Sequence, residues 1–391
     1  MEIQVDITEF STEQQKHLIQ TLSGAWAFVP PLLPPQIAIT PEIAMALAQT
    51  AMAIGELNGA SRRLQNPYML VNPLIRKEAL TSSAMEGTFT TVNNIILEEV
   101  EPSLSGNDDS REAYNYANAL GRAEFMLENL PLSHRVIKHA HVMLLSGLSA
   151  QRGAGKKPGE YKTSQNAIGQ IGDDVRSARY VPPPPAQTQN CMDDLEKFIN
   201  REERLQGQKL LDLAVIHYQF EAIHPFNDGN GRMGRMIITL AAKQMGLIDL
   251  PILHVSSFLE SRKNEYIEKL FAVSTKSEWE QWIVFFLFAI EQSSLAATKL
   301  VDRIINLQSE LRELVKLRGK SKRLSLIVDE LFSKGWTTAT ETHKNIGVTF
   351  KTAQADLKEL VNLGILQENS TKHSIVYFAP QINKLSDRGL S

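Results

Sequence analysis

The sequence predicts a mainly α-helical protein that carries a small β-hairpin in its core and a winged helix-turn-helix domain at its C-terminus. Apolar residues recur at helical spacing in most segments of the chain. Residues 159–185 are instead too rich in Gly, Asn and Pro for a stable helix, which favours a short hairpin with an extended exit. Residues 324–378 contain three helical patterns followed by two short β runs, as in a winged helix.

We expect two or three domains from a chain of 391 residues. The boundaries that the sequence suggests are an N-terminal helical region at 1–110, a core at 111–300, a helical linker at 301–322 and the winged-helix domain at 323–391. The proline cluster at 30–35 predicts an extended arm packed on the body, with an SH3-type ligand as the alternative. The first long helix is expected directly after this arm, with Thr40 as its N-cap.

The composition, 43% hydrophobic and 22% charged residues, is typical of a soluble globular protein. A net charge of −3 provides no general attraction to nucleic acid or anionic membranes. The single cysteine, Cys191, excludes an intramolecular disulfide and fits a reducing compartment. The acidic N-terminus lacks a signal-peptide pattern, and the longest apolar run, 282–290, is shorter than the roughly 20 residues that cross a bilayer. We therefore expect a cytoplasmic protein with no membrane partner.

The stretch from His224 to Arg235 combines more chemistry than any other part of the chain. His224 is its only group that titrates near neutral pH, so it is the candidate proton acceptor. Asp228 offers an anionic oxygen suited to Mg²⁺. The Gly-Asn-Gly run at 229–231 tolerates positive φ and can point successive N–H groups at phosphate oxygens.

Two arginines follow this anion loop at the start of a predicted helix, residues 232–244. Arg232 and Arg235 stand three residues apart, so both guanidinium groups can reach phosphates bound at the loop. The positive end of the helix dipole adds to the same anion site. The residues alone therefore predict a site for phosphate, a hard cation and a general base.

The string His-Pro-Phe-Asn-Asp-Gly-Asn-Gly-Arg-Met-Gly-Arg resembles the signature of the Fic family, His-Pro-Phe-x-Asp-Gly-Asn-Gly-Arg-x-x-Arg, at every fixed position. Fic proteins are helical bundles, and most transfer AMP from ATP to a hydroxyl side chain of a target protein. The resemblance implies that His224 takes the proton of the target hydroxyl and that Asp228 holds Mg²⁺. It also implies that ATP contacts Gly229, Asn230, Gly231, Arg232, Met233, Gly234 and Arg235, with Arg235 orienting the γ-phosphate.

A second motif lies in the N-terminal region, where Ser82-x-x-x-Glu86-Gly87 resembles the inhibitory motif of one class of Fic proteins. In that class the glutamate pairs with the second signature arginine, here Arg235, and disturbs the placement of the γ-phosphate. An arginine–carboxylate pair is strong enough to compete with phosphate for the same guanidinium group. Ser83 and Glu86 alternatively fit a capping box at the start of a helix.

Three further expectations concern the rim of the site. The segment Gln165, Asn166, Ala167, Ile168 and Gly169 resembles the flap of Fic proteins, whose edge pairs with the target peptide by strand addition; a hairpin without a partner is the alternative. Tyr266 is expected at the adenosine end of the pocket, although Glu265 stands where the family usually has a second aromatic residue. His217 is expected to be packed or hydrogen-bonded, because no third metal ligand stands at suitable spacing.

The exposed start of the third C-terminal helix, Thr349, Lys351, Thr352 and Gln354, would contact DNA if the winged helix binds it. Residues 320–391 contain ten Lys and Arg against seven Asp and Glu, a net of only +3, so protein docking or dimerisation is nearly as well supported. We expect an adenylyltransferase that uses Mg²⁺ and ATP to modify a Ser, Thr or Tyr hydroxyl of another protein or of itself. The alternatives are removal of AMP, with Glu86 orienting a water, and a transcription regulator that senses nucleotide.

Overall fold

The computed structural model describes residues 6–64, 66–101, 108–169, 178–202, 204, 206–316, 321–370 and 375–386. It is mainly helical, as predicted. Its helices are α1 (Pro41–Ser61), α2 (Tyr68–Met85), α3 (Val92–Val100), α4 (Asp108–Met126), α5 (His134–Leu144), α6 (Pro185–Ile199), α7 (Lys209–Ile223), α8 (Asn230–Gln244), α9 (Ser256–Ser261), α10 (Lys263–Lys276), α11 (Trp279–Lys316), α12 (Ser321–Lys334), α13 (Ala339–Ile346), α14 (Phe350–Asn362) and α15 (Pro380–Asn383). Its strands are β1 (Leu18–Gln20), β2 (Trp26–Phe28), β3 (Trp336–Thr338), β4 (Gln367–Ser370) and β5 (Ile375–Phe378).

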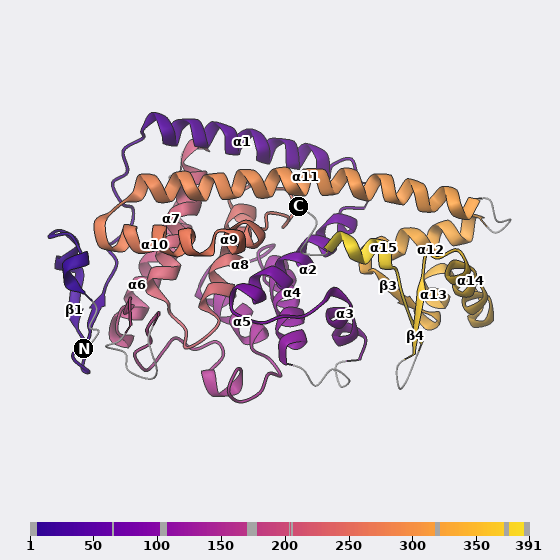
Figure 1. The fold of residues 1–391 in the computed structure, drawn as a ribbon, viewed down its shortest axis with the longest axis horizontal. Helices are drawn as coiled ribbons and strands as arrows, with labels where there is room; N and C mark the ends of the chain where they lie inside the picture. The colour runs from indigo at the N-terminus through magenta and orange to yellow at the C-terminus, as the bar shows by residue number, and fades with distance from the viewer. Residues whose placement is uncertain are drawn as a thin grey trace.

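The long helices α1 and α11 lie side by side along one edge of the helical body (Figure 1). As predicted, α1 begins after Thr40, whose hydroxyl accepts a hydrogen bond from the Ile43 N–H. Thr50, buried in the middle of α1, donates a hydrogen bond of 3.0 Å to the Leu287 carbonyl of α11. α11 is long and apolar enough to cross a membrane by length and composition alone, but half of its most apolar window is buried inside the fold.

Helices α7 and α8 form the centre of the core and carry the signature stretch between them. Nearly every residue of α7 is buried, because other helices pack around it on all sides. Trp282 of α11 donates its indole N–H to the Ala214 carbonyl of α7 at 3.0 Å. Gly234 permits the close approach of α8, since a Cβ there would collide with the Glu221 carboxylate. The site is therefore built on two rigid, tightly packed helices.

The N-terminal arm is packed on the body, but it contains a hairpin that the sequence did not suggest. β1 and β2 pair antiparallel, with Leu18 opposite Phe28. Three-residue strands are too short to show an alternating pattern, which is why this element was missed. The proline cluster is anchored by the Leu33 N–H, which bonds to Asp194, and by the Pro31 carbonyl, which accepts from Gln219. The arm is thus held by the core.

The C-terminal part contains the three predicted helices, α12, α13 and α14, together with a three-stranded sheet of order β3-β5-β4. β3 was not predicted, and β4 begins at Gln367, beyond the expected run at 364–366. Gly364 has a positive φ of 72°, so the chain turns there after α14 ends. Thr349, Lys351 and Gln354 are exposed and Thr352 is half-buried at the start of α14. DNA binding by this face stays a prediction.

This C-terminal module packs directly on α2. Arg76 of α2 is buried and donates to both carboxylate oxygens of Glu99 in α3, at 2.9 and 3.0 Å, and to the Lys334 carbonyl of α12 at 2.6 Å. The Trp336 indole of β3 donates to the same carboxylate at 2.9 Å. One buried arginine therefore ties α2, α3 and the C-terminal module together.

Replacing this arginine is expected to destabilise the protein. Arg76→Ala leaves the Glu99 carboxylate without its cation and the Lys334 carbonyl without its donor, so the free energy of unfolding should fall by about 3 kcal/mol. Arg62→Ala is the matched control, because the Arg62–Asp249 pair is exposed and should change stability by less than about 0.5 kcal/mol. Urea unfolding of both variants measures the difference, and equal small effects would show that the junction contributes little.

Candidate active site

The signature stretch forms a compact turn between α7 and α8. α7 ends at Ile223, and His224 adopts the left-handed conformation with φ 48°. Gly229 also has a positive φ, 77°, and directly precedes the first residue of α8. The Asn230 side chain closes the turn, because its oxygen accepts from the Phe226 N–H and its amide donates to the Phe226 carbonyl, both at 2.8 Å. The sequence correctly placed the anion loop at a helix start.

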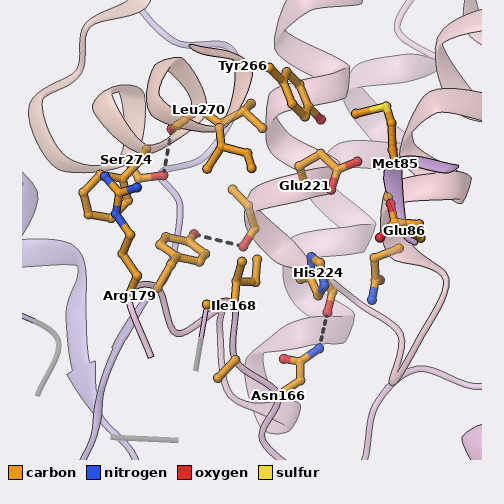
Figure 2. Close-up of a pocket in the computed structure, with 18 of the residues that line it drawn as sticks. Met85, Glu86, Asn166, Ile168, Arg179, Glu221, His224, Tyr266, Leu270 and Ser274 are labelled. Atoms are coloured by element: carbon orange, nitrogen blue, oxygen red, sulfur yellow. Dashed lines mark hydrogen bonds between the residues drawn. The ribbon is translucent and has the colours of Figure 1, made fainter. Parts of the chain in front are cut away.

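A cavity of about 550 Å³ opens beside this turn, large enough for a nucleotide. Figure 2 shows Glu86, Glu221, His224 and Tyr266 facing it from different parts of the chain. The predicted site residues that line it are Glu86, Asn166, Ala167, Ile168, Gly169, His224, Asp228, Gly229, Asn230, Gly231, Arg235 and Tyr266.

Three predicted nucleotide contacts do not line the cavity. Met233 is fully buried in the hydrophobic core. Gly234 packs against α7, and its carbonyl lies 3.2 Å from a His217 ring nitrogen. Arg232 is buried behind the loop. Helical periodicity explains the correction: positions 233 and 234 turn inward when 231 and 235 face the cavity.

His224 is held through its backbone carbonyl. Asn166 donates to that carbonyl at 2.9 Å and to the Phe226 carbonyl at 2.9 Å (Figure 2). The buried Lys162 ammonium donates at 3.1 Å to the carbonyls of both Ile223 and His224, and at 2.8 Å to the Asn166 side-chain oxygen. These two side chains fix the unusual backbone of His224. Sequence reasoning missed Lys162, and it gave Asn166 a target-docking role instead.

The environment of His224 keeps its ring neutral. Burial and the Lys162 ammonium together lower the pKa of His224 to about 4, against the opposing effects of the Glu221 backbone and of the Glu86 charge. The ring nitrogen Nδ1 is shielded from solvent, and the Glu221 backbone is near enough to raise the pKa of the ring, although no hydrogen bond of acceptable geometry joins Nδ1 to a described residue. A neutral imidazole at pH 7 can accept a proton, which suits a general base.

His141 of α5 packs against the loop, and the sequence analysis did not identify it. Its ring stacks on Phe226 with centroids 3.8 Å apart. Nδ1 accepts from the Gly159 N–H at 2.9 Å, so Nε2 carries the hydrogen and donates to the Asp228 carbonyl at 3.0 Å. Burial lowers the pKa of His141 to about 4, which keeps this tautomer uncharged. His141 thus orients the backbone of the predicted metal ligand.

Asp228 suits a hard cation. Its Oδ1 accepts from the Gly229 N–H at 2.6 Å and from Arg232 at 3.4 Å, while no bond from the described residues engages Oδ2. The side chain is 36% exposed and lines the cavity. The described residues contain no group of three or more His, Cys, Asp or Glu that could hold a metal. Asp228 alone plus phosphate oxygens fits the way in which Mg²⁺ is usually bound.

Arg232 has a structural partner where a phosphate was expected. Its guanidinium pairs with Glu112 of α4, and both side chains are only 3% exposed. Glu112 is also bonded by Thr88 at 2.8 Å and approached by Arg152 at 3.3 Å. This buried network connects α8 to α4 and to the chain just after Glu86. A phosphate that reached Arg232 would have to displace Glu112 or share the Arg232 guanidinium with it.

Arg235 is almost fully buried and is held by the predicted inhibitory motif. Its Nε donates to the Ser82 hydroxyl at 2.8 Å, and its Nη2 donates to the Ser82 carbonyl at 2.9 Å and to Glu86 Oε1 at 2.8 Å. Burial raises the pKa of Glu86, but Arg235, Arg232 and Lys263 together outweigh burial, so the pKa lies below its ordinary value. The capping-box alternative is wrong, because Ser83 and Glu86 lie at the end of α2.

The Glu86 carboxylate lies over the anion loop itself. A Cβ built at Gly231 would collide with Glu86 Oε1, so the carboxylate sits directly against the first turn of α8. The N–H groups of that turn have no partner within the helix. Gly87 makes this placement possible, since its φ of 85° turns the chain away immediately after α2. The carboxylate therefore occupies space that a phosphate would need.

Glu221, a buried carboxylate that the sequence analysis did not single out, lines the same cavity. Burial raises the pKa of Glu221 to about 7, although Arg235 opposes the shift. Tyr266 lies nearby, and its hydroxyl donates to His217 Nε2 at 2.9 Å. His217 is therefore a packed, hydrogen-bonded residue, as predicted. Glu265 pairs with Arg262 at 3.1 Å. Glu221 and Tyr266 form the deep wall of the cavity.

The predicted flap is reduced to one antiparallel bridge within the described residues. Ile168 exchanges backbone hydrogen bonds of 2.8 and 3.2 Å with Tyr180, and the predicted loop at 170–177 lies outside the described part. The side chain of Gln165 bonds to the Asn166 and Pro182 carbonyls, so it holds the segment in place. Because the backbone groups of Ile168 bond to Tyr180, we expect those of the neighbouring residue Ala167 to point to the opposite edge of the segment. Target pairing at that edge stays a prediction.

Comparison with known proteins agrees with this geometry. The model of the Fic/DOC family matches residues 131–242, and the model of the Fic/DOC family N-terminal region matches residues 44–124. The chain belongs to the Fic/DOC family. The matched N-terminal region contains α2 with Ser82 and Glu86, and the matched domain contains the whole signature stretch.

The individual relatives and solved structures that match the chain are similar to it at low sequence identity. A probable protein adenylyltransferase of Aquifex aeolicus (strain VF5) is 23% identical over 177 residues, 45% of this chain and 50% of the relative. The protein adenylyltransferase Fic of Drosophila yakuba is 25% identical over 203 residues, 50% of this chain and 36% of the relative. The matches thus span half or less of these curated relatives. A Fic family protein from Desulfovibrio desulfuricans G20 shares the fold with a TM-score of 0.57 at 20% identity, over 88% of this chain and 98% of that chain.

We expect glycine at position 87 to be needed for stability only because of its backbone conformation. A side chain at Gly87 meets no atom within 4 Å, so the cost of Gly87→Ala is the strain of positive φ, about 1 kcal/mol of unfolding free energy. Gly55→Ala is the control, because Gly55 lies inside α1 with open space around it and Ala favours a helix by about 1 kcal/mol. Denaturant unfolding should therefore give opposite signs; two changes of the same sign would contradict the assignment.

Lys162 should set the proton affinity of His224. Lys162→Met removes a positive charge beside the ring, so the pKa of His224 should rise from about 4 toward its ordinary value. The midpoint of the His224 ring titration in ¹H–¹³C NMR should lie near pH 4 in the wild type and higher in the variant, where burial of the ring, the larger cause, still keeps it below its ordinary value. Lys197→Met, on the exposed face of α6, controls for loss of a lysine. An unchanged His224 titration in Lys162→Met would remove the electrostatic role.

Proposed function

We propose that the protein is a Mg²⁺-dependent protein adenylyltransferase, which transfers AMP from ATP to a Ser, Thr or Tyr hydroxyl and is inhibited by Glu86. Membership of the Fic/DOC family and the names of its relatives support a transferase of this general type. The observation that carries the proposal is the meeting of His224, the anion loop and the Arg235–Glu86 pair in one cavity.

The anion loop supports binding of the triphosphate. The first-turn N–H groups of α8, which begins at Asn230, and the dipole of that helix favour an anion beside Gly231. Asp228 Oδ2 is available to hold Mg²⁺ in contact with the phosphates, and the ion would neutralise their charge when bound. The remaining cavity volume extends toward Tyr266, where the adenosine is proposed to bind.

The chemical step needs one base and a positioned phosphate. The target hydroxyl oxygen forms a bond to the α-phosphorus, while the bond from that phosphorus to the oxygen bridging to the β-phosphorus breaks. The hydroxyl proton moves to His224, and pyrophosphate leaves with the electron pair of the broken bond. His224 is neutral at pH 7 and fixed by Asn166 and Lys162, so it is ready to accept the proton.

Inhibition follows from competition for Arg235. In the structure the guanidinium is already bonded to Ser82 and Glu86, so a γ-phosphate has to displace a carboxylate that lies against Gly231. The pKa of Glu86 lies below its ordinary value, so the carboxylate stays charged at every pH above that range. Mild acidification is therefore not expected to relieve the inhibition.

The target is proposed to dock at the outer edge of residues 165–169.

Label transfer from α-³²P-labelled ATP with Mg²⁺ tests the proposal. Wild type should label itself or lysate proteins weakly, and Glu86→Gly should label them strongly, because Arg235 is then free to orient the γ-phosphate. Glu86→Gln, which keeps the size and a hydrogen-bond acceptor but not the charge, should give an intermediate rate. Adding His224→Ala to Glu86→Gly should reduce the rate by about 10² to 10⁴.

His139→Ala in the Glu86→Gly background is the control, since His139 is exposed on α5 and should leave the rate unchanged. Folded Glu86→Gly protein that binds ATP but transfers no label would overturn the proposal. In that case AMP-modified protein becomes the next substrate. Loss of AMP hydrolysis in Glu86→Gly would assign Glu86 the role of orienting water. Sequence-selective, salt-dependent DNA binding would instead favour a nucleotide-sensing regulator.

A further inference from the structure

One face of helix α10 runs along the active-site cavity. The residues that this helix contributes to the cavity wall are Lys263, Tyr266, Ile267, Leu270, Phe271 and Ser274. Steps of three and four residues place these side chains on one side of a helix. The face begins with an ammonium group at Lys263 and becomes apolar at Leu270 and Phe271. The cavity therefore has a cationic end and an apolar end, both lined by the same helix.

Lys263 lies at the end of the cavity that holds the inhibitory motif. Its Nζ donates a hydrogen bond to the carbonyl of Met85, the last residue of α2. Met85 and the next residue, Glu86, lie together at one side of the cavity (Figure 2). Burial raises the pKa of Glu86, and Lys263 is one of three cations, with Arg235 and Arg232, that lower it. Lys263 of α10 and Arg235 of α8 thus act on the same carboxylate from two different helices.

The ammonium group of Lys263 can still bind an anion. It has three N–H donors, and the only bond that it makes to the described residues is the one to the α2 carbonyl. Lys263 is exposed and forms no ion pair with a carboxylate in the described part of the chain. Arg179, another cation in the cavity wall, is already paired with Glu268. Among the described cations that line the cavity, Lys263 therefore has unused donors close to Arg235.

The charge of a triphosphate requires more than one cation at this end of the cavity. A nucleoside triphosphate stays negative after it has bound one Mg²⁺, and an unbalanced charge in a partly buried cavity is costly. The signature stretch contains two arginines, but Arg232 is buried in its pair with Glu112. Arg235 therefore needs a second cation from outside the signature stretch, and α10 places Lys263 near the same carboxylate.

We propose that Lys263 is the second cation of the triphosphate site and binds the terminal phosphate of the nucleotide together with Arg235. One N–H of the ammonium keeps the Met85 carbonyl, and another donates to a phosphate oxygen. The phosphate then replaces Glu86 as the anion beside both cations. Lys263 thereby selects nucleoside triphosphates over monophosphates. This inference rests on the proposed function, because it specifies the nucleotide that the same site takes.

A purely structural role for Lys263 predicts a different result. An ammonium on the last carbonyl of α2 also stabilises the C-terminal end of that helix. Loss of such a cap would disturb the whole site and weaken every nucleotide to a similar extent. Loss of a ligand to the terminal phosphate would weaken ATP, whereas AMP lacks that phosphate and would be unaffected. The ratio of ATP affinity to AMP affinity therefore distinguishes the two roles.

Calorimetry with Mg²⁺ on the full-length Glu86→Gly/His224→Ala protein, which should not transfer AMP, measures this ratio. Adding Lys263→Met should weaken ATP binding at least about tenfold and AMP binding less than about twofold. ADP should lose less affinity than ATP, and Lys263→Arg should keep most of the ATP affinity. Lys269→Met is the matched control, because Lys269 lies on the same helix, bonds to Gln281 and does not line the cavity. It should leave both affinities unchanged.

The inference is overturned if Lys263→Met weakens ATP and AMP equally, or weakens neither. Label transfer gives a second readout in the Glu86→Gly background. There Lys263→Met should raise KM for ATP about tenfold and change kcat less than about threefold, because Lys263 does not touch the reacting bonds. If ATP affinity falls selectively but no variant transfers label, the proposed function fails and the assignment of Lys263 stands.

Discussion

The buried guanidinium of Arg235 is the constraint on which the site depends. It lies at the inner end of the cavity, fixed by the core position of α8, and a buried cation requires an anionic partner. Glu86 provides that partner in the observed state, and Ser82 accepts hydrogen bonds from Nε and Nη2. Under the proposed function, inhibition and catalysis are an exchange of one oxyanion for another on the same cation. Because neither state leaves the charge unpaired, the free-energy difference between the two states is a difference between two pairings.

Helix α2 is the element through which distant parts of the molecule reach that cation. Its middle is fixed to α12 by Arg76, which also binds the Glu99 carboxylate that accepts from Trp336 of β3, and its C-terminal end holds Arg235. A helix transmits a displacement along its axis because its own hydrogen bonds keep it rigid. The C-terminal module therefore packs on the same helix whose C-terminal end contacts Arg235.

The signature stretch could be recognised from sequence because its chemistry is contiguous. His224, Asp228 and Arg235 lie within twelve residues, and the Ser82–Glu86 motif adds one local pattern. The supporting residues could not be found in this way. Lys162 and Asn166 reach carbonyls about sixty positions away, and Arg76 bonds to Lys334, 258 positions along the chain. Long-range polar contacts leave no periodic signal in sequence. Short strands such as β1 were not predicted for a different reason, because three residues are too few to show an alternating pattern.

The length of α11 has a consequence for how the molecule moves in solution. This helix continues for 38 residues, about 57 Å, from the helical core to the C-terminal module at the far end of the molecule (Figure 1). Buried side chains on it extend from Trp282 to Val315, so it belongs to both parts. The two parts should therefore tumble together as one elongated body. NMR relaxation should fit one anisotropic rotational diffusion tensor for both parts. Two domains on a flexible tether would instead require a separate tensor for each domain.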